Sequence, residues 1–409
     1  MKHPSADTKA DIPSYLTFID KDPFPYYEQL RNEDPVHWDE AMQAWLVTQF
    51  DDCTVVMKNE EVFGHPYHDF KGAAKVQGGA RGILMLRGEE HTRMHRYLLQ
   101  FFSKSVVLAY RETIIRPLVD RLLDRLLPVG SADLAGQFGF ILPSHVIAVM
   151  LGIPIEDEEL LEKTRHWNDD IMRWSETFGE DPDSLASALD SAEHLRDTLL
   201  PIIRDRRDAP RDDFISKLWA EGPRILEPWT EDEVLAQCRV LFFAGSETTA
   251  HGLSNALSYW LKAPEVRSRL SAETIPTYIE ETLRVFGVIH FRVRVALQDV
   301  ELGGKLIKKG DRVHPMNSAA NRDAAHFAHA NLVDLDRERI KQHLAFNVGP
   351  RTCIGAELAR GEIIEAMERV IQKLPDAQLD PSKPAPEYLG HMPRSFRPLN
   401  VKFTPRTAV

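Results

Sequence analysis

The sequence predicts a mainly helical protein with a smaller strand-rich region, an α+β fold in which helices dominate. Helical periodicity of apolar residues runs from about residue 51 to residue 286. Strands are expected before this stretch, at 36–38 and 45–48, because β-branched and aromatic residues gather there. After Arg294 the apolar spacing shortens again to that of strands.

Two segments illustrate the helical and the strand pattern. Residues 106–127 predict an amphipathic helix whose apolar side carries Leu108, Ile115, Leu118, Leu122 and Leu126. Residues 300–307 predict a hairpin that turns at Gly303 and Gly304.

One helix is expected to be unusually long. Thr230 and Glu233 form a capping-box pattern, and the helical pattern continues to about Lys262, before Pro264. Roughly 32 residues at about 1.5 Å per residue give about 48 Å, enough to cross a whole domain.

The length of 409 residues exceeds the usual size of a single hydrophobic core, roughly 250–300 residues. The chain could therefore form two domains or one large one. No repeat or Gly/Ser-rich linker divides it, so we expect one domain over residues 1–409, with a flexible N-terminal segment at 1–13.

The bulk charge and the cysteines exclude several classes of protein. A net charge of −12 argues against non-specific nucleic-acid binding and against an anionic membrane surface. Cys53, Cys238 and Cys353 are far apart and odd in number, which favours a reducing compartment. Residues 1–13 are polar, and no apolar run approaches membrane-spanning length. We expect a cytoplasmic monomer that binds no nucleic acid and no membrane.

The most informative segment is 346–355, FNVGPRTCIG, which leads directly into a helix. That helix is marked by the apolar spacing of Ile364, Met367, Ile371 and Leu374. Cys353 therefore lies at a helix N-terminus, which favours a thiolate. Thiolate is a strongly donating ligand for iron and favours O–O cleavage at a heme. The alternative is a buried structural cysteine.

This segment resembles the heme-binding loop of the cytochrome P-450 family, F-x-x-G-x-[HR]-x-C-x-G. Its fixed positions are filled by Phe346, Gly349, Arg351, Cys353 and Gly355. The resemblance implies Cys353 as the axial ligand of heme b (iron protoporphyrin IX). It also implies that the heme lies between the long central helix and the helix after the cysteine loop. Five matched positions disfavour the purely structural interpretation of the cysteine.

A second segment, 244–249, resembles the family signature [AG]-G-x-[DE]-T-[ST] on that long helix. O–O scission needs protons, and a carboxylate beside a hydroxyl can deliver them. The resemblance assigns Thr248 to hydrogen-bonding dioxygen and Glu247 to relaying protons, with Ala244 next to the heme. Gly245 and a threonine bond toward residue 244 would loosen the helix there.

Further family segments follow in the expected order. Glu281 and Arg284 match E-x-x-R, and Arg337 lies in a segment resembling the one that donates a second arginine. Such residues would form an architectural ion network rather than a catalytic one. At i, i+3 on a helix, Glu281 and Arg284 are neighbours.

Groups that could bind the heme propionates are arginines and histidines, and the resemblance points to His91, His95, Arg294 and Arg351. His95 stands where arginine is usual in H-x-x-x-R, so it would bind a propionate more weakly and with a dependence on pH. Arg96 is the alternative, although it projects about 100° away on a helix.

The segments that line the pocket in relatives contain Tyr67, Val240, Leu241, Ile289, Phe291 and Met392. They imply a small to medium, mostly apolar substrate such as a terpenoid or an aromatic, with one polar group. The alternative is that these are ordinary core residues.

The family resemblance implies a monooxygenase that uses O₂ and electrons from an iron–sulfur ferredoxin with its NAD(P)H-dependent reductase. Basic residues near the cysteine, Arg93, Arg96, Lys104 and Arg360, could make the docking face. Two alternatives are a peroxide-driven hydroxylase and a non-enzymatic heme-thiolate sensor. Neither needs the pair Glu247 and Thr248, so this pair argues against both.

Overall fold

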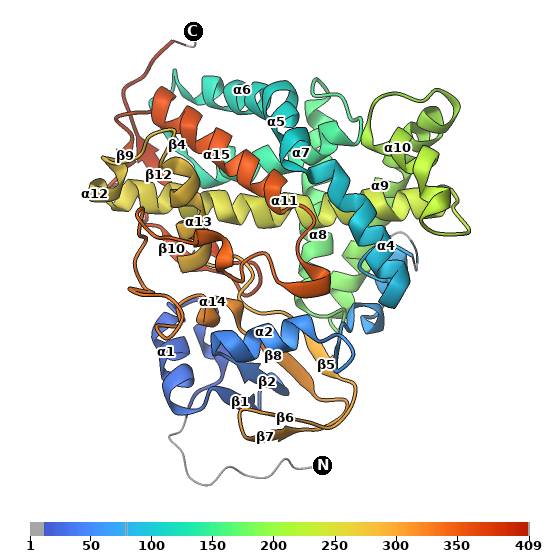
Figure 1. The fold of residues 1–409 in the computed structure, drawn as a ribbon. Helices are drawn as coiled ribbons and strands as arrows, with labels where there is room; N and C mark the ends of the chain where they lie inside the picture. The colour runs from blue at the N-terminus through green and yellow to red at the C-terminus, as the bar shows by residue number, and fades with distance from the viewer. Residues whose placement is uncertain (1–11, 78, 80, 408–409) are drawn as a thin grey trace.

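The computed structural model of the protein describes residues 12–77, 79 and 81–407 (Figure 1). The helices are α1 Phe24–Glu33, α2 Phe50–Lys58, α3 Ala73–Val76, α4 Gly88–Leu99, α5 Lys104–Tyr110, α6 Arg116–Leu126, α7 Leu142–Met150, α8 Glu158–Glu176, α9 Pro182–Asp208, α10 Phe214–Glu221, α11 Glu231–Lys262, α12 Pro264–Arg267, α13 Ile275–Val285, α14 Asn317–Ala320 and α15 Ala356–Lys373. The strands are β1 Val36–Asp39, β2 Ala44–Val47, β3 Phe63–Gly64, β4 Ser131–Asp133, β5 Arg294–Ala296, β6 Val300–Leu302, β7 Lys305–Ile307, β8 Arg312–Pro315, β9 Gln378–Leu379, β10 Glu387–Leu389, β11 Ser395–Arg397 and β12 Asn400–Lys402. The mainly helical fold with a smaller strand-rich region is confirmed.

The predicted long helix is α11, and it crosses the whole molecule (Figure 1). It begins at the capping box of Thr230 and Glu233 and contains 32 residues. Most of its side chains are buried, since α7, α8, α9 and α15 all pack against it. A buried central helix of this kind holds its side chains in fixed positions, so it can form the rigid wall of a site.

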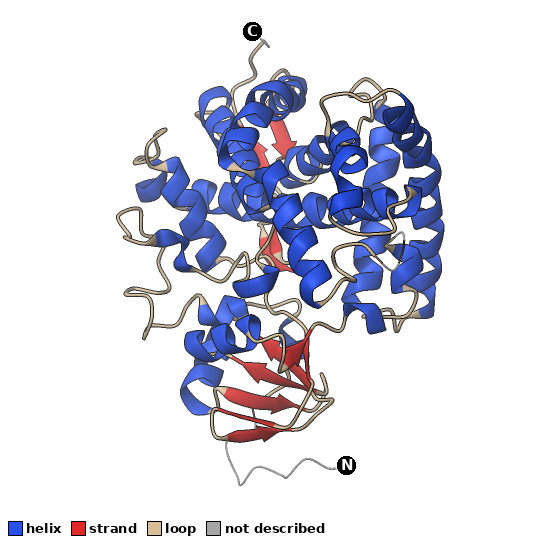
Figure 2. Cartoon of the chain, turned by 45° about the vertical axis from the view of Figure 1, so that its right-hand side comes forward, coloured by secondary structure: helices blue, strands red, loops and turns tan. Residues whose placement is uncertain are grey.

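The strand-rich region gathers at one end of the molecule, around the N-terminal part of the chain (Figure 2). Its largest sheet has five strands in the order β1-β2-β8-β5-β3. The predicted hairpin is confirmed as β6 and β7, with Val300 opposite Ile307. Strand β5, which lies between β8 and β3 in this sheet, begins at Arg294.

The stripe predicted over residues 106–127 is only partly correct. Ile115, Leu118, Leu122 and Leu126 are buried, but Leu108 is 50% exposed. The cause is a π-helical segment, Arg111–Ile115, which separates α5 from α6. A π turn holds more residues than an α turn, so positions before it face a different direction from the one that a continuous α-helix predicts.

Residues 1–11 of the N-terminal segment expected at 1–13 lie outside the described residues. Within the described part of the chain, no helix has both the length and the apolar character needed to span a membrane. The single-domain organisation stays a prediction.

Candidate active site

A cavity of about 350 Å³ lies between α11, the start of α15 and the segment that leads into β5. Cys353 lines this cavity together with Thr248 on α11 and Arg294 on β5. Residues from three distant parts of the sequence therefore meet around one space, as the family resemblance implies.

The cysteine loop holds Cys353 by backbone geometry. The Cys353 amide donates a hydrogen bond to the carbonyl oxygen of Phe346 at 2.8 Å. Gly349 has φ +79°, and a Cβ there would lie 3.0 Å from the Cα of Lys58. Only glycine fits both requirements, because L side chains avoid this backbone region. The loop is thus fixed by its own sequence.

Burial raises the pKa of the Cys353 thiol, while the Gly355 amide, Arg292 and Arg360 act in the opposite direction. A bound metal ion would deprotonate this thiol outright, since a coordinating sulfur binds as thiolate. The side chain of Phe346 also lines the cavity, and the Arg360 guanidinium stacks over its ring at 4.4 Å.

Gly355 borders open space. A Cβ at this position would meet no described atom within 4 Å outside its immediate neighbours. A flat macrocycle bound at Cys353 could therefore approach the backbone closely here.

The two arginines predicted to bind propionates both line the cavity. Arg294 is 1% exposed, and its Nε and one terminal nitrogen have no hydrogen-bond partner among the described residues. Burial lowers its pKa to about 10. Arg351 pairs with Glu60 and donates to the carbonyl of Leu86 at 2.9 Å. An unpaired buried guanidinium is costly, so the site fits a ligand that carries carboxylates.

The two histidines predicted beside them also line the cavity. Buried His91 has an unpartnered Nδ1, and burial lowers its pKa to about 3. His95 lies 2.6 Å from the carbonyl oxygen of Thr352 through Nε2. The alternative residue Arg96 is exposed and does not line the cavity.

Sequence reasoning missed Arg292, which lines the same cavity. Its Nε is unpartnered among the described residues, and its guanidinium donates to the carbonyl of Ala345 at 3.3 Å. A period of two in an extended segment could have revealed it, since residues 292 and 294 share one face. His65 lies near Arg351 and Arg294 as well, and burial lowers its pKa well below the ordinary value.

On α11 the segment with Thr248 faces the cavity, with Ala244, Gly245 and Thr249 beside it. The Thr248 hydroxyl donates to the carbonyl oxygen of Ala244 at 2.9 Å. This bond is the one expected to loosen the helix at this turn.

Glu247 does not line the cavity and points toward α8. Its carboxylate lies 3.2 Å from Nε2 of His251, whose Nδ1 lies 2.7 Å from the Ser395 hydroxyl. Burial lowers the pKa of His251 to about 3, so the ring is neutral. Thr248 and Glu247 are therefore neighbours in sequence, but the Thr248 side chain lines the cavity and the Glu247 side chain lies outside it.

The predicted ion network is present and buried. Arg284 donates two hydrogen bonds to Glu281, at 2.6 and 2.9 Å, and Arg337 donates a third at 2.9 Å. Both Glu281 and Arg284 have fully buried side chains. Arg284 also donates to three backbone carbonyls in the segment before the cysteine loop.

All six residues predicted for the substrate pocket line the cavity: Tyr67, Val240, Leu241, Ile289, Phe291 and Met392. Most of the remaining wall is apolar. Among the six, Tyr67 carries a polar group: its hydroxyl is hydrogen-bonded to Ser175 and accepts from Gln77 at 3.2 Å.

The predicted docking residues divide into two groups. Arg93, Arg96 and Lys104 are exposed. Arg360 is not available for docking, because its side chain is 13% exposed and bonds to Glu280 at 2.5 Å and to Glu357 at 3.0 Å. The expectation for Arg360 was wrong, since residues on α13 and α15 neutralise it.

A cysteine loop, a loosened helix turn and buried arginines around one apolar cavity are typical of heme-thiolate proteins. The family model described as "Cytochrome P450" matches residues 36–275 and 274–387, so the chain belongs to the cytochrome P450 family.

Known proteins resemble the chain over most of its length. It is 31% identical to "Cytochrome P450 109" of Bacillus spizizenii, over 85% of this chain and 84% of that protein. It is 32% identical to "Cytochrome P450-SU2" of Streptomyces griseolus, over 88% of each. The crystal structure of CYP109E1 from Bacillus megaterium in complex with corticosterone has a TM-score of 0.81, 27% identity and coverage of 94% and 98%. The chain is therefore an oxygenase of this family, which implies a heme cofactor and redox partners.

Proposed function

We propose that this enzyme inserts one oxygen atom from O₂ into a small to medium, mostly apolar molecule with one polar group. Two electrons would come from an iron–sulfur ferredoxin with its NAD(P)H-dependent reductase, and the cofactor would be heme b. The observation that carries the proposal is the shared cavity, because Cys353 and Thr248 both line it and most of its wall is apolar.

Cys353 would hold the heme iron, and Arg294, Arg351, His91 and His95 would hold its propionates. Heme bound by thiolate supplies O₂ activation that favours O–O cleavage. The unpartnered nitrogens of Arg294 support this assignment, since two carboxylates would satisfy them. The open space beside Gly355 supports it as well.

Thr248 would hold the reacting oxygen by its hydroxyl, and Glu247 would return protons to that hydroxyl from outside the cavity. The hydroxyl can exchange its bond to the Ala244 carbonyl for one to a ligand in the cavity, because both residues line it. The carboxylate stays anchored to His251 meanwhile. Neither a sensor nor a peroxide-driven hydroxylase has use for this arrangement.

Two kinds of side chain in the cavity wall would select the substrate. Val240, Leu241 and Phe291 offer apolar contact, which favours terpenoid or aromatic skeletons. Tyr67 offers a hydroxyl that already takes part in a bond to Ser175, and it would bind one polar group of the substrate.

The test is reconstitution with a ferredoxin, its reductase and NAD(P)H under ¹⁸O₂, after terpenoids and aromatics have been screened for a low-spin to high-spin change of the ferric protein. The proposal predicts a product that carries one ¹⁸O atom per molecule. A spectral binder that is oxidised only when peroxide is added would support the peroxide-driven alternative. No oxidation of any spectral binder under either condition would support the sensor.

A further inference from the structure

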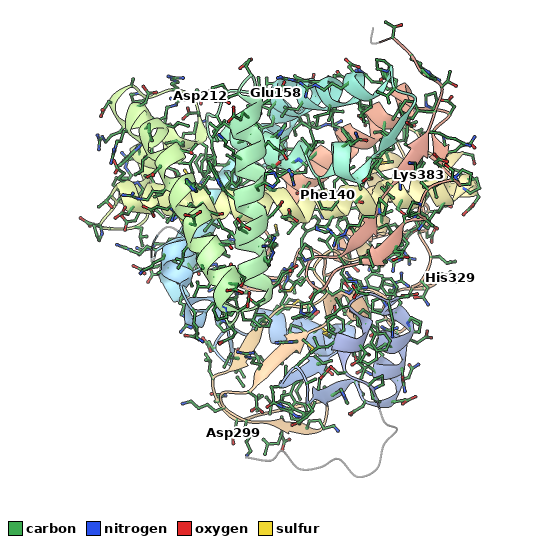
Figure 3. The ribbon with its side chains drawn as sticks, turned by 180° about the vertical axis from the view of Figure 1, so that it is seen from behind. Phe140, Glu158, Asp212, Asp299, His329 and Lys383 are labelled. Atoms are coloured by element: carbon green, nitrogen blue, oxygen red, sulfur yellow. The ribbon has the colours of Figure 1, made fainter. Side chains whose placement is uncertain are left out.

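One face of α8 presents carboxyl groups to the central turn of α11. Asp169, Met172 and Glu176 share this face because they are spaced at i, i+3 and i+7. Met172 lines the cavity, which places the face at its wall. Figure 3 shows α8 lying across the middle of α11 when the molecule is seen from behind, next to the labelled Phe140.

Asp169 is hydrogen-bonded to Glu247, carboxyl to carboxyl. A hydrogen bond between two carboxyl groups requires a proton on one of them, because two carboxylates have no donor between them and repel each other. Burial, followed by the contact with Glu247, raises the pKa of Asp169 to about 8. Asp169 therefore carries the proton of this hydrogen bond at neutral pH.

The cations near the pair leave this proton in place. Arg165 on α8 donates to Asp169 at 3.1 Å, but it also donates twice to Glu162. The Glu162 carboxylate therefore offsets part of the positive charge that Arg165 presents to Asp169. His166, also on α8, only weakly lowers the pKa of Asp169. Arg397 on β11 and Arg173 on α8 act on Glu176, whose pKa burial raises to about 7.

His251 fixes the other partner of the pair. It lies on α11 one turn after Glu247 and is held by Ser395 on β11. A neutral ring that donates to Glu247 through Nε2 accepts from the Ser395 hydroxyl through Nδ1. The Glu247 carboxylate is thus oriented from two sides, by His251 and by Asp169.

Exposure decides where a proton enters. The side chain of Asp169 is 31% exposed, that of Glu247 is 14% exposed and that of His251 is 3% exposed. Solvent therefore reaches the pair through Asp169, while His251 ends in a buried hydroxyl.

We propose that Asp169 shares one proton with Glu247 and is the group through which Glu247 is reprotonated from solvent. When a proton is needed at Thr248, Asp169 gives its proton to the Glu247 carboxylate, Glu247 passes that proton toward Thr248, and Asp169 takes one proton from water, so one proton enters for each one delivered. Asp169 is a positioning residue in this relay, since it acts through Glu247. The kinetic part rests on the proposed function; the shared proton does not.

The shared proton is tested by infrared spectroscopy of the resting protein between pH 6 and pH 9. A carbonyl stretch of a protonated carboxyl should be present at pH 7, titrate near pH 8, disappear in Asp169→Asn and shift in frequency in Glu247→Gln, which replaces its hydrogen-bond partner. The matched control is Asp170→Asn, because Asp170 accepts instead from Ser191 on α9. Two other carboxyl bands should remain in Asp169→Asn: one from buried Glu362, whose pKa is raised well above its ordinary value and which does not titrate in this range, and one from Glu176, which titrates near pH 7. A spectrum that Asp169→Asn leaves unchanged would overturn the proposal.

The relay is tested by turnover in H₂O and D₂O. Asp169→Asn should slow product formation about tenfold or more and increase the solvent isotope effect, because the amide keeps a hydrogen bond but cannot pass a proton. Asp169→Glu should restore much of the rate, and Asp170→Asn should behave as wild type. A wild-type isotope effect and pH profile in Asp169→Asn would refute the relay. Failure of all variants and of wild type to turn over would count against the proposed function, while the infrared result would still decide the shared proton.

Discussion

The hydroxyl of Thr248 donates to the carbonyl oxygen of Ala244 at 2.9 Å, one turn earlier on the same helix. Both residues line the cavity that Cys353 also lines. The only hydroxyl hydrogen of Thr248 is therefore held at the cavity wall by a neutral acceptor, from which a ligand can take it.

Replacing Thr248 with alanine should uncouple electron consumption from product formation. We expect the yield of product per NAD(P)H to fall about tenfold, with hydrogen peroxide released instead, because the reacting oxygen loses its hydrogen-bond partner. The measurement is product and peroxide against NAD(P)H consumed. Thr248→Ser keeps the hydroxyl and should stay close to wild type. An unchanged yield in Thr248→Ala would show that the assigned role is wrong.

Replacing Arg294 with glutamine should weaken heme retention without destabilising the heme-free protein. Arg294 is buried with unpartnered nitrogens, so its loss removes a costly charge from the empty site and a charged hydrogen bond from the loaded one. A loss of about 1.5–3 kcal/mol makes heme transfer to apomyoglobin about ten to a hundred times faster. Exposed Arg96 provides the control, Arg96→Gln, which should not change this rate. Equal rates in all three proteins would remove Arg294 from the heme site.

Replacing Glu281 with glutamine should destabilise the fold by about 3–5 kcal/mol, because it leaves the fully buried Arg284 without its carboxylate. The loss is measured by urea unfolding with far-ultraviolet circular dichroism. Glu301→Gln, on the exposed side of β6, should change little. If the two variants unfold at the same urea concentration, the buried network does not brace the cysteine loop.

Replacing Tyr67 with phenylalanine should weaken binding of substrates that carry a polar group about fivefold, the equivalent of about 1 kcal/mol for one hydrogen bond. Purely apolar binders should be unaffected. Spin-state titration gives both dissociation constants. Tyr97→Phe is the matched control, because the Tyr97 hydroxyl bonds to the Lys217 carbonyl away from the cavity. Equal losses for polar and apolar binders would mean that Tyr67 only shapes the wall.

The raised pKa of Asp169 also predicts how stability depends on pH. An acid with a folded-state pKa of about 8 and an ordinary value near 4 binds more protons in the folded state between these limits. The contribution of Asp169 to the free energy of unfolding therefore falls progressively as pH rises from about 4 to about 8. The difference in thermal midpoint between Asp169→Asn and wild type should shift in favour of the variant from pH 5 to pH 8 and then level off. A difference independent of pH would contradict the raised pKa.

Sequence patterns were sufficient for features that depend on local geometry. Cys353, Thr248 and the capping box at Thr230 occupy fixed spacings, so their places could be predicted. Pairings between distant elements could not be. Nothing in the periodicity of α8 indicates that Asp169 meets Glu247, and nothing near Arg360 indicates that Glu280 neutralises it.

The π-helical segment at Arg111–Ile115 shows a second limit. Apolar spacing assumes a constant number of residues per turn, so one irregular turn was enough to place Leu108 on the wrong face. Arg292 was missed for a different reason, because the family resemblance pointed to Arg294 alone in this segment.

The absorption spectrum of the dithionite-reduced protein with carbon monoxide tests the central claim most directly. Ligation by the Cys353 thiolate predicts a strongly red-shifted Soret band, and Cys353→His should move that band to the position typical of histidine-ligated heme. A wild-type band already at the histidine position in freshly prepared protein, or no bound heme at all, would contradict the account.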